Sequence, residues 1–408
     1  MKNVLMLTNG FPPHAGVEAS RAAHLAKYLP DYGWQPHVVC SHWTQTNCPK
    51  YDPHFGGDRV KSYVVATVPP PADLSQVRSL SDIAAKAERF LSGHKNPSVW
   101  TDAILRRVNE HLQTHTIDAV WATYPFRATL YAADRINRAH EIPWIADFRD
   151  IFEQWTPRSQ WWFERRNERA VVRSASKIVT VSLGLVRILE QRYTQSVECL
   201  PNGFDPEEME TVEAKSDPGA FSIVHTGSIT PPGSVFRASP SDLFVAVDNL
   251  AARGLITLDE VMLMFYGATE DQMRPHLNGC ACSRIIKTVP WLPRHEIFSL
   301  QKGAGLLLLL GARMPGIITA KLFEYLSSGR PIMVIPPDHN GVDDLLKKTR
   351  SGAALSTTDE IEAFLLKHYQ AWKSGAPLNV EINAEEVNRY SRKKQAGVLA
   401  GWLNEISR

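Results

Sequence analysis

The 408-residue sequence is 44% hydrophobic and 22% charged, as expected of a globular protein. At this length we expect two domains, each large enough for its own core. The net charge of +2 excludes the broad positive field of a nucleic-acid-binding protein. No apolar run approaches the roughly 20 residues that span a bilayer.

The N-terminal stretch MKNVLMLTNGFPP contains one lysine, a short apolar run and two prolines, with no small-residue cleavage site. We interpret it as a first strand, not a signal peptide. The five cysteines are few and odd in number, which favours reduced thiols and a cytoplasmic location. Cys280 and Cys282 form CAC, but no second Cys/His pair nearby supports a metal site.

In the first half of the chain, short apolar runs alternate with helical patterns, which is typical of parallel α/β units. We expect strands at 3–8, 36–40, 119–122, 143–148, 177–182 and 197–201, and helices at 19–29 and 87–93. A stretch rich in Pro, His and Gly, from about Thr44 to Asp73, is too long for a simple connection. We interpret it as an acceptor-side insertion or a mobile loop.

A second α/β series follows an acidic, proline-containing stretch at 205–219, which is the natural linker. Its strands are expected at 221–226, 261–266, 284–289, 305–310 and 331–335. We therefore expect two doubly wound domains, at 1–204 and 205–385, and a tail at 386–408 that returns to the N-terminal domain as one amphipathic helix or two short ones. The basic run Arg392, Lys393 and Lys394 fits a solvated helix face better than a binding patch.

A lysine at the start of a predicted helix is the most informative feature of the second half. In GIITAKLFEYL, the helix is expected to begin near Thr319, whose hydroxyl can cap it. Its free N–H groups and the positive end of its dipole favour a phosphate. Lys321 is unfavourable for that dipole, so a bound diphosphate explains it better than a structural role. Glu324 lies on the same face and could pair with Lys321 or accept hydrogen bonds from a ribose or sugar hydroxyl.

Each predicted domain also places a glycine loop after its first strand. Gly16, in TNGFPPHAGVEASRA, precedes a helix that should begin near residue 18 or 19. Gly227 and Ser228, in HTGSITPPGSVFRASPSDL, are followed by Arg237. Glycine lets the backbone approach a ligand closely, so the two loops together indicate ligand sites at the first strand of both domains.

The order of several motifs resembles a known family over nearly the whole chain. The motifs are NGFPPHAGVEASRAAHLAKYL, IPWIADFRDIF, SKIVTVS, CLPNGFD, IVHTGS and TAKLFEYLSSGRPI. They resemble GT-B glycosyltransferases of family 4, and most of all bacterial transferases of surface-polysaccharide assembly of the acetyl-fucosamine transferase type. The resemblance implies an α/β fold of two Rossmann-like domains facing a cleft, a nucleotide-diphosphate sugar donor and, usually, retention of anomeric configuration. It also implies no metal or other cofactor, because a helix N-terminus, Arg and Lys meet the diphosphate charge.

By this resemblance the C-terminal domain binds the donor. Lys321 matches the family's phosphate lysine, which we also count as catalytic, and Glu324 matches the glutamate that holds the ribose. The first glutamate of that paired motif falls at Ile317, so the motif is incomplete and backbone groups from 316 to 319 could replace it. The remaining expected donor contacts are Gly16, Gly227, Ser228, Arg237, Val289 with the segment to Leu292 for the nucleobase, Ile318 and Thr319.

The N-terminal domain would bind the acceptor. Asp147, Arg149 and Asp150 follow an apolar strand, so we expect them at the cleft rim. We assign Arg149 and Asp150 catalytic roles and Asp147 an acceptor contact; the alternative is an ion-pair network that only fixes the loop.

Histidines in strand-end loops are further candidates, although a lone histidine is more often structural. His14 and His225 could contact acceptor or donor. Thr123 and Tyr124 stand where many relatives carry a cleft histidine, and Tyr124 is a candidate acceptor contact. No conventional general base can be named, but in a retaining transfer the leaving phosphate can accept the proton.

The segment 154–173, QWTPRSQWWFERRNERAVVR, combines tryptophans with arginines. Such a composition is found at anionic membrane surfaces. We favour a helix that packs its tryptophans on its own domain, and keep peripheral contact with the inner face of the membrane as the alternative.

The function that the sequence supports is a cytoplasmic glycosyltransferase that moves a hexose or amino-sugar to a hydroxyl of a glycan or lipid-linked acceptor. Three alternatives remain open. They are a sugar-nucleotide epimerase on the same fold, a transferase for a small-molecule natural product, and a catalytically silent sugar-nucleotide-binding protein.

Overall fold

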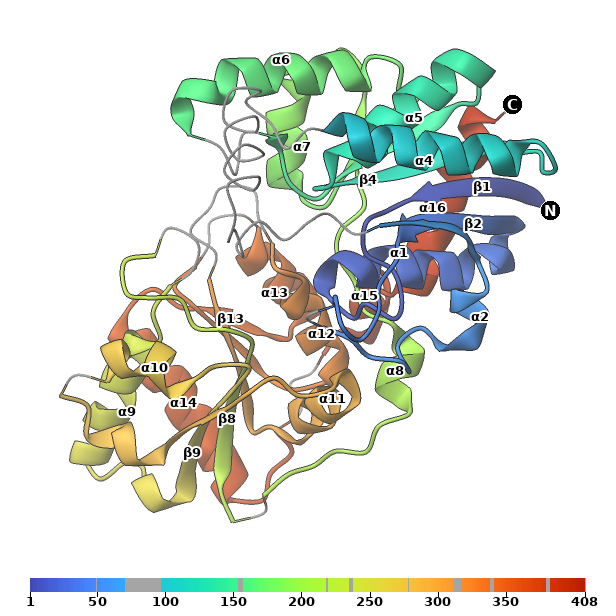
Figure 1. Ribbon diagram of the computed structural model, residues 1–408. Coiled ribbons are helices and arrows are strands. Elements are labelled where there is room, and N and C mark those ends of the chain that lie inside the picture. The colour runs from blue at the N-terminus through green and yellow to red at the C-terminus, as the bar shows by residue number, and fades with distance from the viewer. Residues whose placement is uncertain are drawn as a thin grey trace. The chain divides into compact units, whose positions relative to one another are not determined.

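The computed structural model describes residues 1–48, 50–69, 97–152, 157–217, 219–234, 238–277, 279–311, 318–337, 341–378 and 382–407 (Figure 1). The chain forms two compact units. The first comprises Met1–Val181, Leu185–Pro201 and Arg392–Arg408. The second comprises Ser182–Gly184 and Asn202–Ser391. The main chain therefore leaves the first unit after Pro201 and re-enters it at Arg392, where the sequence predicted boundaries at 204/205 and 385/386.

The first unit is built on a seven-stranded parallel sheet with the order β3-β2-β1-β4-β5-β6-β7. Its central strands bear apolar side chains on both faces because helices cover both faces. The strands are β1 (Lys2–Leu7), β2 (Trp34–Ser41), β3 (Val64–Val68), β4 (Ala119–Tyr124), β5 (Trp144–Phe148), β6 (Lys177–Thr180) and β7 (Val197–Cys199).

Two groups of helices enclose this sheet. On one face lie α1 (Val17–Tyr28), α2 (Gly57–Lys61) and α16 (Arg392–Ile406), whose apolar side chains share one core. Helix α16 lies beside α1 (Figure 1). The opposite core is completed by α4 (Pro97–Leu112), α5 (Arg127–His140), α6 (Trp161–Val172) and α7 (Leu183–Glu190).

The second unit repeats the design with a six-stranded parallel sheet of order β10-β9-β8-β11-β12-β13. The run GLLLLLG supplies its fully buried strand β11 (Leu306–Leu310). The other strands are β8 (Phe221–Thr226), β9 (Val261–Tyr266), β10 (Ile286–Val289), β12 (Ile332–Ile335) and β13 (Gly352–Ala354).

Helices again cover both faces of the second sheet. One core includes side chains from α9 (Ser241–Ala252), α10 (Glu270–Met273) and α14 (Thr358–Lys373). The other includes side chains from α11 (Arg294–Gly303), α12 (Ala320–Ser328), α13 (Val342–Thr349) and α15 (Ala384–Asn388). The short helix α8 (Pro206–Glu210) contacts α11 and α12.

The predicted doubly wound α/β fold is confirmed, and each predicted strand is present with small shifts of its ends. The interpretation of 44–73 as one irregular loop is wrong for 57–68, which form α2 and the edge strand β3. The strand β13 was also not predicted. The predicted helix at 87–93 lies outside the described residues. The tail forms two helices, α15 and α16, which is one of the two patterns that the sequence predicted.

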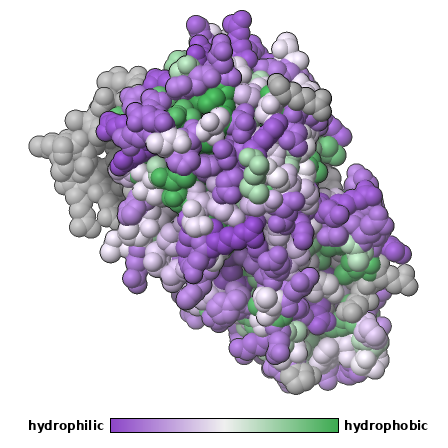
Figure 2. Space-filling model, turned by 90° about the vertical axis from the view of Figure 1, so that its right-hand side faces the viewer, coloured by the Kyte–Doolittle hydropathy of each residue, from purple (hydrophilic) through white to green (hydrophobic). Residues whose placement is uncertain are grey.

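The face of the molecule drawn in Figure 2 is mostly hydrophilic, with hydrophobic residues in small separate patches. Within the described part of the chain, no helix has both the length and the apolar character needed to cross a membrane.

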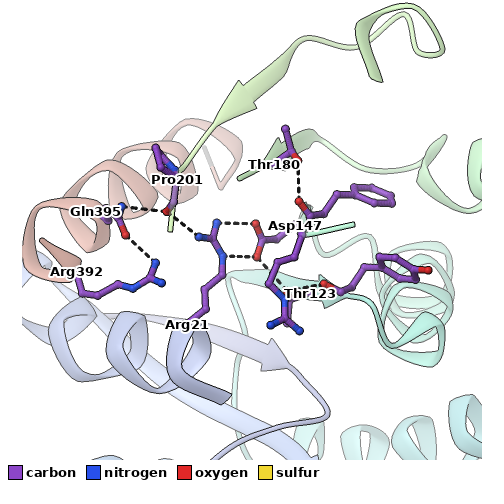
Figure 3. A network of polar contacts seen from close by, with 10 residues as sticks. Arg21, Thr123, Asp147, Thr180, Pro201, Arg392 and Gln395 are labelled. Atoms are coloured by element: carbon purple, nitrogen blue, oxygen red, sulfur yellow. Dashed lines mark hydrogen bonds and ion pairs between the residues drawn. The ribbon is translucent and has the colours of Figure 1, made fainter. Parts of the chain in front are cut away.

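A buried polar network joins the elements of the first unit (Figure 3). Arg21 of α1 donates from Nε and from its second terminal nitrogen to the two carboxylate oxygens of Asp147 on β5, both at 2.8 Å. Thr123 of β4 donates to the same carboxylate at 3.0 Å. The Pro201 carbonyl accepts from Arg21 and from Gln395 of α16, each at 3.0 Å. The Arg21–Asp147 ion pair and the hydrogen bonds around it therefore connect α1, β4 and β5 with α16. They also hold Pro201, where the chain leaves the unit.

We expect Asp147→Asn to lower the free energy of unfolding by about 3–5 kcal/mol, because the buried guanidinium of Arg21 would lose its counter-charge. Arg135→Ala serves as the control, since Arg135 pairs with Asp102 in an exposed salt bridge worth about 0–1 kcal/mol. Urea unfolding followed by circular dichroism measures both. Equal losses of unfolding free energy in the two variants would show that the buried pair stabilises the fold no more than an exposed one.

Candidate functional site

The second sheet changes winding direction between β8 and β11, which are neighbours in the sheet. Ligands of open α/β sheets bind beyond the carboxyl ends of the strands at such a point. The Gly227 loop follows β8, and α12 begins after β11. Both predicted donor motifs of this unit therefore flank the position where the fold favours a ligand.

Gly227 and Lys321 lie in direct contact, although 94 residues separate them in the sequence. Gly227 has φ of +123°, and a Cβ built on it would overlap the Lys321 ammonium and lie 2.5 Å from its Cε. Any other residue at 227 would be strained and would displace the lysine side chain. The structure thus places one cation of the first turn of α12 directly over the glycine loop.

Tyr325 fixes the helix against the sheet. Its hydroxyl accepts from the Thr226 amide at 2.9 Å and lies 3.3 Å from the Leu308 carbonyl, to which it donates. Tyr325 is fully buried on α12, one turn after Lys321. These bonds attach α12 to β8 and β11 together and so set where the first turn stands.

The helix begins as predicted, with Thr319 at the N-cap in an extended conformation. The predicted capping by its hydroxyl is wrong, because the Leu322 amide bonds to the Thr319 carbonyl at 3.2 Å instead. Among the described residues, the buried Thr319 hydroxyl has no hydrogen-bond partner.

Glu324 pairs with Arg294 of α11, and not with Lys321 as one alternative proposed. Arg294 donates to Glu324 Oε1 at 3.1 Å and to Glu208 of α8 at 2.9 Å. Burial favours the neutral guanidinium, but the two carboxylates outweigh it and raise the pKa of Arg294. Glu324 Oε2 makes no hydrogen bond with the described part of the chain, so one oxygen is held and the other can accept.

Arg294 was not predicted as a site residue, although the sequence contained a signal. It is the first residue of α11, where a cation is unfavourable for the helix dipole. The same argument identified Lys321. The carboxylates that stabilise Arg294 come from α8 and α12, which only the fold brings together.

The other predicted donor residues lie in the same unit, apart from Gly16. Val289 ends β10, and its carbonyl accepts from the Gly267 amide at 2.7 Å. Ser228 is exposed, and Ile318 is half-buried against the core beside α12. Arg237 and the segment 312–317 lie outside the described residues.

In the first unit, the loop after β1 holds a second polar cluster. His14 is buried between Cys48, whose Sγ is 3.0 Å from Nδ1, and Glu18, whose Oε1 is 2.5 Å from Nε2. Its ring stacks on Trp43 with centroids 4.8 Å apart. Gly16 is the N-cap of α1, and a Cβ there would lie 2.5 Å from His14 Nε2 and 2.6 Å from Glu18 Oε2. The glycine is therefore required for the His14–Glu18 contact.

Glu18 is the strongly perturbed acid of this cluster. Burial alone would raise its pKa, but the hydrogen bond from His14 and the nearby positive charges lower it to about 2. Its carboxylate therefore stays ionised and accepts from Nε2 of His14, while Nδ1 of the same ring faces the Cys48 thiol. Glu18 was not predicted as a site residue.

The charges after β5 do not lie together at a rim as predicted. Asp147 is fully buried in its pair with Arg21. Arg149 and Asp150 are half-buried, and Arg149 donates to the Tyr124 carbonyl at 3.0 Å. Burial lowers the pKa of Arg149, and the charges of Asp147 and Asp150 oppose that effect. For Asp147 the observed contacts are those of the ion-pair network given as the alternative.

Two further predicted groups have structural partners. Tyr124 is buried and stacks on Phe152 at 4.8 Å, and burial raises the pKa of its hydroxyl. His225 is buried and donates from Nδ1 to the Leu308 carbonyl at 3.0 Å. Burial raises the pKa of the Cys280 and Cys282 thiols.

Comparison with known proteins gives this geometry a chemical meaning. Residues 18–203 match the family described as Glycosyl transferase 4-like domain. Over this stretch, which is less than half of the chain, the protein is similar to glycosyltransferase 4-like domains. The match covers nearly all of α1, the Arg21–Asp147 pair and the strands from β2 to β7, so the enzyme class expected from the sequence is confirmed. No curated protein matches the chain.

Solved structures similar to this glycosyltransferase cover both units. Sucrose-phosphate synthase from Thermosynechococcus elongatus is 11% identical, with a TM-score of 0.66 over 99% of this chain and 98% of that one. Anabaena HepE in complex with UDP-glucose is 12% identical, with a TM-score of 0.63 over 99% and 100% of the two chains. A glycosyltransferase from Rickettsia africae is 13% identical, with a TM-score of 0.64 over 99% and 98%. At these identities the likeness establishes the GT-B fold.

The His14–Glu18 contact makes stability dependent on pH. Because the folded-state pKa of Glu18 is about 2 against an ordinary 4.5, the contact stabilises the fold above pH 4.5 and is lost as the pH falls toward 2. We expect Glu18→Gln to be less stable than the native protein at about pH 7, with a gap that narrows by about pH 3. Urea unfolding midpoints of both proteins at the two pH values measure this difference. A difference in stability that stays constant with pH would contradict the lowered pKa of Glu18.

Proposed function

We propose that this glycosyltransferase moves a sugar from a nucleotide-diphosphate donor to a hydroxyl of a glycan or lipid-linked acceptor, with retention of anomeric configuration. The observation that carries the proposal is the contact of Lys321 with Gly227 at the winding switch of the second sheet. A full positive charge, a close-approach glycine and a helix N-terminus meet there, and each favours a diphosphate.

Each described group at this point has a role in binding the donor. Lys321 would neutralise the diphosphate, and the Gly227 loop would offer backbone N–H groups close to it. Glu324, oriented by Arg294 through Oε1, would accept from the ribose hydroxyls through Oε2. The segment from Val289 to Leu292 would face the nucleobase. The HepE complex supports a nucleotide sugar as the ligand of this fold, since that structure contains UDP-glucose.

We assign acceptor binding to the first unit. Arg149 and Asp150 follow the carboxyl end of β5, and the His14–Glu18 pair lies after β1, so both sets of polar groups are near strand ends. His14 is already occupied on both ring nitrogens. The proton of the acceptor hydroxyl would therefore pass to the departing diphosphate, whose negative charge Lys321 helps to stabilise. This route requires no general base from the chain.

The sugar and the pathway are finer proposals. The resemblance to transferases of the acetyl-fucosamine type favours an acetylated amino-sugar and an acceptor of surface-polysaccharide or lipopolysaccharide assembly. The alternatives are an epimerase, a transferase for a small-molecule natural product, and a silent binding protein. Nucleotide release measured with and without acceptors separates them, because an epimerase and a binding protein release no nucleotide in response to an acceptor.

Lys321→Ala should weaken binding of a nucleoside diphosphate by about 1.5–3 kcal/mol, or about 10- to 150-fold, the size of a hydrogen bond to a charged group. Lys347→Ala is the matched control, because Lys347 is an exposed lysine of the same unit that pairs with Asp343. Calorimetric titration with UDP, GDP and dTDP measures affinity, and thermal melting checks the fold. Equal affinity of both variants for the bound nucleotide would remove Lys321 from the site.

The division of roles between the units has its own test. Asp150→Asn should depress turnover far more than nucleotide affinity, since Asp150 belongs to the acceptor unit. Steady-state kinetics with donor and acceptor varied separately distinguishes the two effects. Weak donor binding with near-normal turnover at saturating donor would contradict the assignment.

A further inference from the structure

Helix α6 turns a basic and aromatic stripe away from its own unit. Trp162, Arg166, Arg169 and Arg173 are spaced by four, three and four residues, which places them in line on one face of a helix. All four are exposed, and Trp162 is 70% exposed. Phe163, 42% exposed, and Arg165 flank this line. We call these six residues the α6 stripe.

The inward face of α6 has the opposite charge. Glu164 and Glu168 are fully buried, and Val171 and Val172 pack in the core. Arg127 meets Glu164 at 2.8 Å. Glu168 accepts from Arg192 at 3.2 Å, from the Tyr193 hydroxyl and from the Phe152 amide at 2.9 Å.

The acidic residues of α6 are thus used to anchor it, while its cations remain on the outside. In Figure 1, α6 lies next to α5 and α7 at the edge of the helix layer.

The expectation that the tryptophans of this helix pack on their own domain is wrong for Trp162. Its ring is 70% exposed, and the guanidinium of Arg166 lies over it at 5.7 Å from the centroid. Within the described chain, Arg158, Arg166, Arg169 and Arg173 pair with no carboxylate. Two adjacent exposed aromatic residues, Trp162 and Phe163, beside arginines that pair with no carboxylate form a surface of the composition that binds anionic membranes.

We propose that the α6 stripe docks on the surface of an anionic lipid bilayer. Tryptophan is favoured at the headgroup level because its ring is apolar and its N–H is polar. Each arginine near an anionic surface strengthens binding by about five-fold. The helix is anchored through the buried Glu164 and Glu168, so its backbone is already folded when the stripe meets the bilayer. Docking depends only on this face and does not rest on the identity of donor or acceptor.

The test is co-sedimentation of the full chain with large vesicles of phosphatidylcholine alone and of equimolar phosphatidylcholine and phosphatidylglycerol. The native protein should sediment with the anionic vesicles only, and less so as salt rises. Arg166→Glu combined with Arg169→Glu should weaken binding by at least about 25-fold, since two five-fold terms are lost before any repulsion is counted. Trp162→Ala should weaken it by a smaller factor and leave the salt dependence unchanged.

Lys393→Glu combined with Lys394→Glu is the control. It makes the same change in charge on exposed positions of α16, whose core-facing side packs on the opposite face of the same sheet. It should sediment like the native protein, and thermal melting should show all variants folded. Three results would overturn the proposal: no sedimentation of the native protein with anionic vesicles, an equal loss in the α16 control, or retention on heparin without binding to either vesicle.

Discussion

The buried pair of Arg21 and Asp147 is the constraint on which the first unit depends. A guanidinium at 1% exposure must have its charge and its donors satisfied within the protein. The two carboxylate oxygens and the Pro201 carbonyl satisfy them with the geometry of a planar fork. Those acceptors come from the middle of the sheet and from the segment where the chain leaves the unit. The Gln395 amide then reaches the same carbonyl from α16. The Arg21 guanidinium and its acceptors thereby hold α1, the sheet, the segment at Pro201 and α16 in fixed positions within this unit.

The second unit uses charge differently, at the ends of helices. Lys321 and Arg294 both stand in the first turn of a helix, where the dipole disfavours a cation. Arg294 is compensated internally by Glu208 and Glu324. Lys321 lies over the Gly227 loop, at the place where the fold favours a phosphate. The internal ion pair fixes Glu324, the carboxylate that the donor would use, so under the proposed function the two unfavourably placed cations would serve one site.

The sequence predicted the fold well because central strands of a parallel sheet are continuous apolar runs, such as the leucines of β11. It failed for β3 and β13, which are short edge strands with partly exposed residues. Lys321 and Gly227 could be identified singly from local signals. Their contact could not, because it joins the ends of two strands far apart in the chain. Asp147 was misplaced for the same reason: its partner lies 126 residues away, and a carboxylate at a strand end looks exposed until that partner is known.

The return of α16 to the first unit affects the order in which the chain can fold during synthesis. Leu399, Leu403 and Ala396 fill the core beside α1, and Gln395 completes the hydrogen bonding at Pro201. Until residues 392–407 emerge from the ribosome, the part of this face that α16 covers stays exposed beside α1 while the whole second unit is translated. The unit that is made first is therefore completed last, and during that interval it is the part of the nascent chain that most needs protection by a chaperone.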